Sequence, residues 1–556
     1  MNTLKRFINY MKFDTQSSTT SNTSPSTEKQ KKLAEYLVNE LHELGLNNAY
    51  MDNYGYVYAY LEGTSPKNKT IGLISHMDTS PDASGENITP NIIESYSGSV
   101  IKLNDNISLD PSEFPSLKEK LGHTLITTNG NTLLGADDKA GICIIVSTVE
   151  RIIKNKLPHP NLIITFTPDE EIGEGTKNFN YQYYKEHNCN FAYTIDGGDI
   201  NYISYENFNA ASCEITVNGK SIHPGDAKNK MVNSIQVAME FNALLPVNQR
   251  PEYTEGYEGF YHLSNIEGGV ENTKLSYIIR NHNKELFEKQ KALVLEIANF
   301  LNSKYGYKVI DVNLTDSYYN MKELVQKEPK ILEFATKALK ENGLEPKFEA
   351  IRGGTDGARL SYEGILTPNL GTGGENFHGP YEYLDVTDMN KMIDIVTSLL
   401  KIKKRALIIK GLRQIGKTTI VRKFCEEHYE NVVYIDFMHN SSVKSLFDKD
   451  LNVNDLIISL SASNLGAKFI PYKTIIIFDE LQECANARSA IKPFMEDGRF
   501  DLICTGSLLG LRGYNKKVSK GVSTGFEKVI TMKPMDFEEY LWAIGLEKNV
   551  IDYVKT

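Results

Sequence analysis

The sequence predicts an α/β protein with three parts: a catalytic domain with a largely parallel sheet, an inserted α+β domain, and a second, partial α/β core. Three observations lead to this prediction. Short apolar runs typical of buried strands alternate with helical segments. The pattern changes between about residues 208 and 320. The charge balance changes sign near residue 400, with 37 Lys and Arg against 52 Asp and Glu before it and 24 against 19 after it.

The length of 556 residues requires more than one domain, because a single hydrophobic core stops growing at about 250–300 residues. We place the domains at 1–207 with 321–400, at 208–320, and at 401–556. The composition, 40% hydrophobic and 24% charged, excludes disordered, collagen-like and disulfide-scaffold proteins. No run of about 18 apolar residues predicts a membrane span, and the first 12 residues lack the apolar region of a secretory signal.

The six cysteines are scattered, and none are paired at C-x-x-C spacing. This usage predicts free thiols in a reducing environment and therefore a cytoplasmic protein. The acidic first 400 residues argue against nucleic-acid binding, and the basic excess after them is too diffuse to predict it.

In the first part, leucines at helical spacing over 33–44 predict a helix that Gly45 ends, after an N-cap signal at 26–28. Residues 80–130 are rich in Pro, Asn, Ser and Gly and predict loops with a small hairpin at the mouth of a site. The other elements predicted before residue 208 include strands at 56–61, 71–75, 161–167 and 191–196 and a buried helix at 139–155.

The inserted part predicts strands at 211–217 and 274–280 and helices at 231–245 and 286–301. The α/β pattern then resumes with helices at 330–342 and 386–400. Only residues 401–405 separate the last helix from a new strand at 406, so the junction is expected to be short.

Five segments share one design, in which a metal-type ligand follows a short apolar strand, the edge where ligands bind in open α/β sheets. They contain His76 with Asp78, Asp137 with Asp138, Glu170 with Glu171, Asp196, and His378. Singly, each has an ordinary structural interpretation, such as a helix N-cap for an aspartate pair. Together, two histidines and three carboxylates suffice for two zinc ions that share a bridging carboxylate.

These residues resemble the peptidase T family, bacterial tripeptide aminopeptidases of the dinuclear zinc aminoacylase and carboxypeptidase clan. Motifs at 13–17, 25–28, 221–225 and 351–357 resemble the family in the same order, over about 1–400. The resemblance implies a zinc-peptidase catalytic domain with two Zn²⁺ per chain, small peptide substrates and an inserted domain of the lid or dimerisation type. A homodimer through that inserted domain is a hypothesis.

The resemblance also implies roles for the ligands: His76 and Asp196 on one zinc, Glu171 and His378 on the other, and Asp137 bridging both. It makes Asp78 the carboxylate that orients His76 and fixes its tautomer. Glu170 becomes the general base, since it neighbours a ligand and reaches the water without binding metal.

Three basic residues have functional interpretations from the same resemblance. Arg280 and Arg352 are candidate clamps for the carboxylate at the C-terminus of the substrate, and His223 helps to complete the site. A surface salt bridge is the equally weighted alternative for Arg280. The segment 281–283 departs from the acidic residue expected in the family, which affects substrate contacts and leaves the metal site unchanged.

Residues 411–418, Gly-Leu-Arg-Gln-Ile-Gly-Lys-Thr, follow the strand predicted at 406–409 and match the full P-loop pattern. The backbone N–H groups between Gly411 and Gly416 would cradle phosphates. Lys417 would reach the β- and γ-phosphates, and Thr418 would bind Mg²⁺. ATP with Mg²⁺ is therefore the ligand that this pattern predicts.

A second apolar strand, at 474–478, ends in Asp479 and Glu480. Asp479 would hold Mg²⁺ through water, and Glu480 would polarise the attacking water. A strand at 502–505 ends in polar residues. The stretch resembles the core of prokaryotic AAA-type ATPases. The helical lid that normally follows this core is not found in the sequence, so we expect nucleotide binding and do not expect steady ATP turnover.

The leading hypothesis is a two-zinc tripeptide aminopeptidase with an appended nucleotide-binding domain of uncertain function. One alternative is another member of the clan, a dipeptidase, carboxypeptidase or deacylase, with the same metal site. A second alternative is a regulatory ATPase that uses an inactive peptidase as a binding module. A third is that the two modules are joined by a rearrangement or an assembly artefact, with no joint function.

Overall fold

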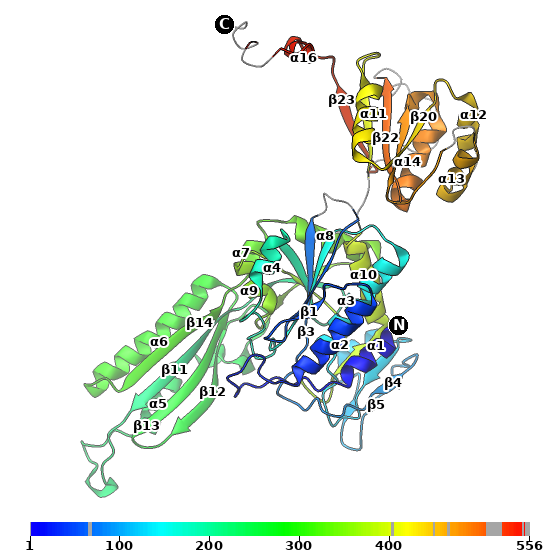
Figure 1. Cartoon of the computed structure of the whole chain (residues 1–556). Coiled ribbons are helices and arrows are strands. Elements are labelled where there is room, and N and C mark those ends of the chain that lie inside the picture. Colours follow the sequence, from blue (N-terminus) through cyan, green and yellow to red (C-terminus); the bar gives the residue numbers. More distant parts are fainter. Residues whose placement is uncertain are drawn as a thin grey trace. The chain divides into compact units, whose positions relative to one another are not determined.

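The structure is a computed structural model that describes residues 2–64, 69–401, 405–448, 451–463, 467–507, 525–546 and 550. The chain divides into two compact units, Met1–Lys401 and Ile402–Thr556. Residues 402–404 of the predicted junction lie outside the described residues. Figure 1 shows the elements of each unit.

The first unit is built on an eight-stranded sheet. Its strands, in spatial order, are β1 (Tyr50–Met51), β2 (Val57–Leu61), β8 (Asn161–Thr167), β3 (Thr70–His76), β9 (Phe191–Ile195), β16 (Asn369–Leu370), β10 (Tyr202–Asn207) and β15 (Lys347–Ile351). The central strands β8, β3, β9 and β16 are parallel. The strands predicted at 56–61, 71–75, 161–167 and 191–196 are therefore confirmed as the neighbours β2, β3, β8 and β9 in a largely parallel sheet.

Helices cover both faces of this sheet (Figure 1). One face packs against α1 (Thr3–Met11), α2 (Gln30–Glu43), α3 (Ala136–Asn155), α8 (Lys330–Glu341) and α10 (Val386–Leu399). The other face packs against α4 (Tyr181–Glu186) and α9 (Asp356–Tyr362). Because successive strand residues point to opposite faces, Leu73 joins the first core and Ile74 the second. This double burial explains why apolar residues of β3 and β8 point to both faces of the sheet.

The region predicted as loops with a small hairpin contains the hairpin of β5 (Ile101–Lys102) and β6 (Ser108–Leu109), and the short helix η1 (Pro115–Glu119). It also contributes two strands that were not predicted. They complete an antiparallel sheet of β17 (Gly374–Glu375), β18 (Tyr383–Asp385), β7 (Leu125–Thr127) and β4 (Asn91–Ile93). This small sheet holds the loop that carries His378.

The inserted segment forms its own four-stranded antiparallel sheet, in the order β12 (Phe260–Gly268), β13 (Asn272–Asn281), β11 (Asn209–Asn218) and β14 (Ile310–Tyr318). Its core includes residues of α5 (Ser234–Leu244) and α6 (Lys284–Tyr305), which lie on the sheet (Figure 1). The described connections include η2 (Pro224–Asp226), η3 (Val247–Gln249), η4 (Pro251–Tyr253) and, after the sheet, α7 (Lys322–Val325). The boundaries at 208 and 320 stay a proposal.

The second unit contains a parallel sheet in the order β20 (Asn431–Asp436), β21 (Thr474–Asp479), β22 (Asp501–Ser507), β19 (Ala406–Gly411) and β23 (Glu527–Met532). Its described helices are α11 (Lys417–His428), α12 (Ser441–Lys444), η5 (Ser445–Asp448), α13 (Val453–Ala462), η6 (Leu481–Glu483), α14 (Ala485–Asp497) and α16 (Phe537–Ala543). Every residue of β21 is buried, as expected for a central parallel strand. In the part of the chain that the structure describes, no helix combines the length and apolar character needed to cross a membrane.

Candidate functional site

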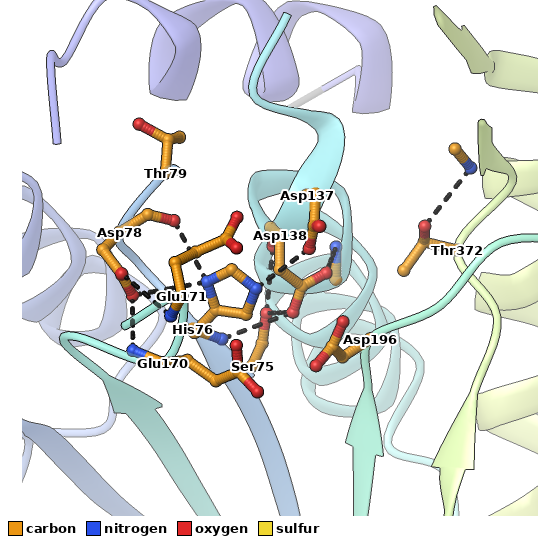
Figure 2. A network of polar contacts seen from close by, with 12 residues as sticks. Ser75, His76, Asp78, Thr79, Asp137, Asp138, Glu170, Glu171, Asp196 and Thr372 are labelled. Atoms are coloured by element: carbon orange, nitrogen blue, oxygen red, sulfur yellow. Dashed lines mark hydrogen bonds and ion pairs between the residues drawn. The ribbon is translucent and has the colours of Figure 1, made fainter. Parts of the chain in front are cut away.

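The predicted ligands of the first unit meet at the carboxyl edge of the eight-stranded sheet. His76 ends β3, Glu171 follows β8, Asp196 follows β9, Asp137 lies at the start of α3, and His378 lies between β17 and β18. Figure 2 shows Asp137, Glu171 and Asp196 grouped around His76. Parallel strands end at the same edge, so segments that are far apart in the sequence deliver their side chains to one place.

Asp137 lies between the two histidines. Its Oδ1 is 2.9 Å from Nε2 of His76, and its Oδ2 is 3.2 Å from Nε2 of His378. Nε2 of His378 is also 2.9 Å from Oε2 of Glu171. Potential ligand atoms of His76, Asp137 and Glu171 lie within 4.8 Å of one another, and those of His76, Asp138 and Asp196 form a second such group. A carboxylate that offers one oxygen to each side has the geometry of a bridging ligand.

The adjacent Asp138 is engaged differently, although the sequence does not distinguish it from Asp137. Its carboxylate accepts hydrogen bonds from the hydroxyl of Ser75 and from the backbone N–H groups of His76 and Gly141. The side chain is buried and oriented away from the bridging position (Figure 2). Its contacts are those of a group that fixes the start of α3 against β3.

Asp78 connects His76 to the segment that carries Glu170 and Glu171. Nδ1 of His76 lies 3.0 Å from the backbone oxygen of Asp78 and 3.4 Å from its Oδ1. The fully buried carboxylate of Asp78 accepts the backbone N–H groups of Glu170 at 2.9 Å and Glu171 at 3.2 Å. Asp78 therefore contacts the ring of His76 mainly through its backbone oxygen and fixes the loop after β8 through its carboxylate.

A second clamp on that loop was not predicted. Asp169 accepts hydrogen bonds from the backbone N–H of Ser26 at 2.7 Å, from its hydroxyl at 2.5 Å, and from Nε2 of Gln30 at 2.7 Å.

The predicted N-cap at 26–28 is wrong, because α2 begins at Gln30 after Lys29, which makes no side-chain capping bond. The hydroxyl of Ser26 bonds across the fold instead, so this motif supports the site.

The site holds more buried carboxylates than nearby cations neutralise. Burial raises the pKa of Glu171 to about 7 and that of Asp196 to about 6, and it raises the pKa of Glu170 well above its usual range. For Asp137, burial also acts to raise the pKa, but hydrogen bonds from His378 and His76 outweigh it and hold the pKa below the ordinary value.

One oxygen of this cluster lacks a partner. Oε1 of Glu171 is buried and accepts no hydrogen bond from any described residue. A buried carboxylate oxygen without a partner is costly unless a cation is provided. Histidine nitrogens and carboxylate oxygens are zinc-type donors, so the residues fit a pair of metal ions.

A cavity of about 900 Å³ opens beside the cluster and contains two of the predicted substrate residues. Nε of Arg280 is buried and makes no hydrogen bond in the described structure, while its Nη1 donates to the backbone oxygen of Arg352 at 3.3 Å. Arg352 instead donates to the backbone oxygens of Gly256, Glu258 and Thr254. Arg280 is therefore the less saturated of the two cations.

Sequence reasoning also missed Tyr318 and Arg359, which line the same cavity. The hydroxyl of Tyr318 is buried without a hydrogen bond to any described residue. His223 is not among the residues that line this cavity. It is exposed and accepts the N–H of Gly225 at its own Nδ1.

The P-loop of the second unit lies between β19 and α11. Gly411 ends the strand, and Gly416 precedes α11 with a φ of 89°, a left-handed conformation that favours glycine. Nζ of Lys417 donates to the backbone oxygens of Leu412 at 2.7 Å and Gly411 at 3.4 Å. The lysine therefore points back into its own loop.

Asp479 and Glu480 lie at the end of β21, next to this loop. Asp479 accepts hydrogen bonds from the hydroxyls of Thr418 at 2.8 Å, Tyr434 at 2.6 Å, and Thr505. Glu480 accepts a hydrogen bond from Nε2 of Gln482. The four polar residues predicted for the nucleotide site thus already have partners within the protein.

Comparisons with known proteins match both units of the chain. Residues 127–402 match the profile of Peptidase family M20/M25/M40, and residues 403–541 match that of an AAA domain. Peptidase T of Clostridium acetobutylicum is 51% identical over 403 residues, 72% of this chain and 98% of the relative. Peptidase T of Halothermothrix orenii is 52% identical over 401 residues, 71% of this chain and 98% of the relative.

Solved structures show the same fold. The aminopeptidase PepT of Bacillus cereus superposes with a TM-score of 0.57 at 22% identity, covering 72% of this chain and 97% of that one. A tripeptidase of Staphylococcus aureus gives a TM-score of 0.57 at 21% identity, with the same coverage. Given the identity to relatives that are matched over nearly their whole length, the chain belongs to the peptidase T family, with an AAA domain following the peptidase.

Proposed function

We propose that the first unit is a two-zinc aminopeptidase that releases the N-terminal residue from tripeptides. One observation carries the proposal: Asp137 offers one oxygen towards His76 and the other towards His378, beside a Glu171 oxygen that has no partner. His76 and Asp196 would hold one metal, Glu171 and His378 the other, and Asp137 both. The relatives of this chain include peptidase T and a tripeptidase, which supports the substrate class.

Two bound zinc ions would supply Lewis-acid polarisation of the scissile carbonyl and ease deprotonation of a water. Glu170 would accept that proton and pass it to the leaving amine. The loop that carries Glu170 is fixed by Asp78 and Asp169, so the base is held beside the ligands without being one of them. Glu170 lines the cavity, where a substrate can reach it.

Arg280 is the better candidate to bind the carboxylate at the C-terminus of the substrate. Its buried Nε has no hydrogen-bond partner in the described structure, and a planar guanidinium suits a carboxylate. Arg352 is bound to backbone oxygens of residues 254–258 and would position that loop. His223 keeps its predicted role only if the inserted sheet or a partner brings it to the cavity.

For the second unit we propose ATP binding with Mg²⁺ at Gly411, Gly416, Lys417, Thr418, Asp479 and Glu480. The match to an AAA domain and the left-handed Gly416 support it. All six cysteines are free and buried, which supports the predicted reducing, cytoplasmic location. The homodimer through the inserted sheet stays a prediction.

The deciding experiment is a panel of free peptides of two to six residues, with N-acetylated and C-amidated versions, assayed with and without a chelator. Tripeptides with both termini free should be cleaved at the first bond, and chelation should abolish cleavage. Preference for dipeptides, acylated amino acids or a C-terminal bond would favour another member of the clan. Absence of any metal-dependent cleavage would favour the binding-module alternative.

A further inference from the structure

The turn that carries His378 is anchored by a side chain that has no role in the proposal above. Glu382 lies four residues after His378 and is 1% exposed. Its Oε2 accepts the backbone N–H groups of Leu134 at 2.6 Å and Gly135 at 2.9 Å, and its Oε1 accepts that of Asp137 at 3.2 Å. One buried carboxylate therefore joins two ligand-bearing segments.

The two histidines depend on this anchor to different degrees. His76 is the last residue of β3, is 3% exposed, and has Asp78 beside its Nδ1. His378 lies in a loop, its side chain is 41% exposed, and it has a φ of 66°. Among the described residues, its ring nitrogens contact only carboxylates, those of Asp137 and Glu171 and, at 3.7 Å, Asp82. His378 itself therefore lies in the loop between β17 and β18, whereas His76 is part of a strand.

We propose that Glu382 is a positioning residue for the metal centre, which sets the distance between Asp137 and His378. This inference rests on the proposed two-metal function, and it makes a more specific claim about the two metal positions. Glu382 governs the metal position that Asp137 shares with Glu171 and His378 much more than the position that Asp137 shares with His76 and Asp196. Groups that orient metal ligands typically change metal affinity by about 10–100-fold when they are removed.

Glu382→Gln is the sharpest variant, because it keeps the size of the side chain and changes one acceptor into a donor. The amide oxygen can still accept the two N–H groups that Oε2 accepts in the wild type. The amide nitrogen then faces the N–H of Asp137, and two donors cannot bond to each other. The substitution therefore leaves the backbone N–H of Asp137, the proposed bridging ligand, buried without a hydrogen-bond partner.

The probe is Zn²⁺ alone, titrated into the full-length apo-chain and followed by calorimetry and by metal analysis after gel filtration. The wild type should bind two ions. Glu382→Gln should bind one ion with nearly wild-type affinity and the second about 10–100-fold more weakly. Glu40→Gln is the matched control, because Glu40 is a buried carboxylate that accepts hydrogen bonds from Arg6 at 2.8 Å and Tyr10 at 2.6 Å and belongs to neither ligand segment. It should lower the melting temperature of the apo-chain and leave both zinc affinities unchanged.

Glu382→Asp is a second variant for the case that Glu382→Gln does not fold. Its shorter side chain keeps the carboxylate charge but lies farther from the backbone N–H groups of Leu134 and Asp137. It should show the same selective loss in a smaller degree. The inference is overturned if Glu382→Gln binds both ions as the wild type does, if both affinities fall equally, or if Glu40→Gln reproduces the selective loss. A wild-type chain that binds fewer than two zinc ions would overturn the proposed function itself, which is a separate result.

Discussion

The peptidase centre and the P-loop site both lie at the carboxyl edge of a parallel sheet, yet their charged groups are satisfied in opposite ways. In the peptidase centre, a Glu171 oxygen is buried without a partner, and burial raises the pKa values of several carboxyl groups. In the P-loop site, Lys417 donates to its own loop and Asp479 accepts three hydroxyl groups.

The difference shows what each site requires of its ligand. The peptidase centre has excess negative charge in a buried place, so cations are needed to stabilise its side chains. The P-loop site is internally hydrogen-bonded, so a nucleotide must displace existing bonds before it gains new ones. We therefore expect peptide hydrolysis to depend strongly on its metal ligands and weakly on anything in the second unit.

The largest effect is expected for Asp137→Ala, which removes the proposed bridge and should abolish tight binding of both metals together with peptide hydrolysis. Metal analysis and a tripeptide assay measure the two losses. Asp479→Ala is the control from the other site and should leave both unchanged. An Asp137→Ala chain that keeps two metals would refute the ligand assignment.

The next effect separates two adjacent glutamates. Glu170→Gln keeps the shape of the proposed base but cannot accept a proton, so kcat should fall by about 10²–10⁴-fold with the metal content unchanged. Glu171→Gln should instead lose metal. Steady-state kinetics and metal analysis are the measurements, and an exchange of the two phenotypes would reverse the assigned roles.

A smaller effect should distinguish the two arginines. Arg280→Ala removes the proposed carboxylate partner, so kcat/KM for free tripeptides should fall about 30-fold or more, the scale of losing a buried charge partner. The value for C-amidated peptides should hardly change. Arg352→Ala should lower both values alike, because it releases the 254–258 loop. Equal losses on free and amidated peptides in Arg280→Ala would remove Arg280 from the carboxylate site.

The smallest effect is expected at the junction of the two units. A chain ending after Leu400 should fold and cleave tripeptides at the wild-type rate, because the predicted ligands and the base all lie before residue 380. Added ATP should change kcat/KM of the full-length chain less than twofold, since coupling needs an element that both ligands bias. A several-fold ATP effect that Lys417→Ala removes would show that the fusion is functional.

The parts of the fold and the site that sequence patterns predict are the local ones. The strands at 71–75 and 161–167 are short runs rich in apolar and β-branched residues, and each ends near a ligand, so their place and chemistry follow from the pattern. Strand β14 was missed although Ile310, Val312 and Leu314 alternate with polar residues, the local pattern of a half-buried strand. Strand β12 has a mixed sequence without that alternation and pairs with β13. Context decides such segments.

The supporting residues of the site escaped prediction for the same reason. Ser26 bonds to Asp169 across 143 positions, and Leu134 bonds to Glu382 across 248. Nothing near Asp169 or Glu382 in the sequence distinguishes a clamp from a ligand or from a solvated carboxylate. The resemblance to a family identified the ligands, whereas only the folded chain shows what holds them in place.

The place of β16 in the central sheet has a consequence for translation. This strand lies between β9 and β10, although the whole inserted sheet separates it from them in the sequence. During synthesis, the edges of β9 and β10 that pair with β16 stay unpaired until residue 370 has left the ribosome. Unpaired strand edges favour aggregation. The contiguous inserted sheet, 209–318, can complete its strand pairing first. The newborn peptidase therefore carries one part that is able to fold early and one that is completed only near its end.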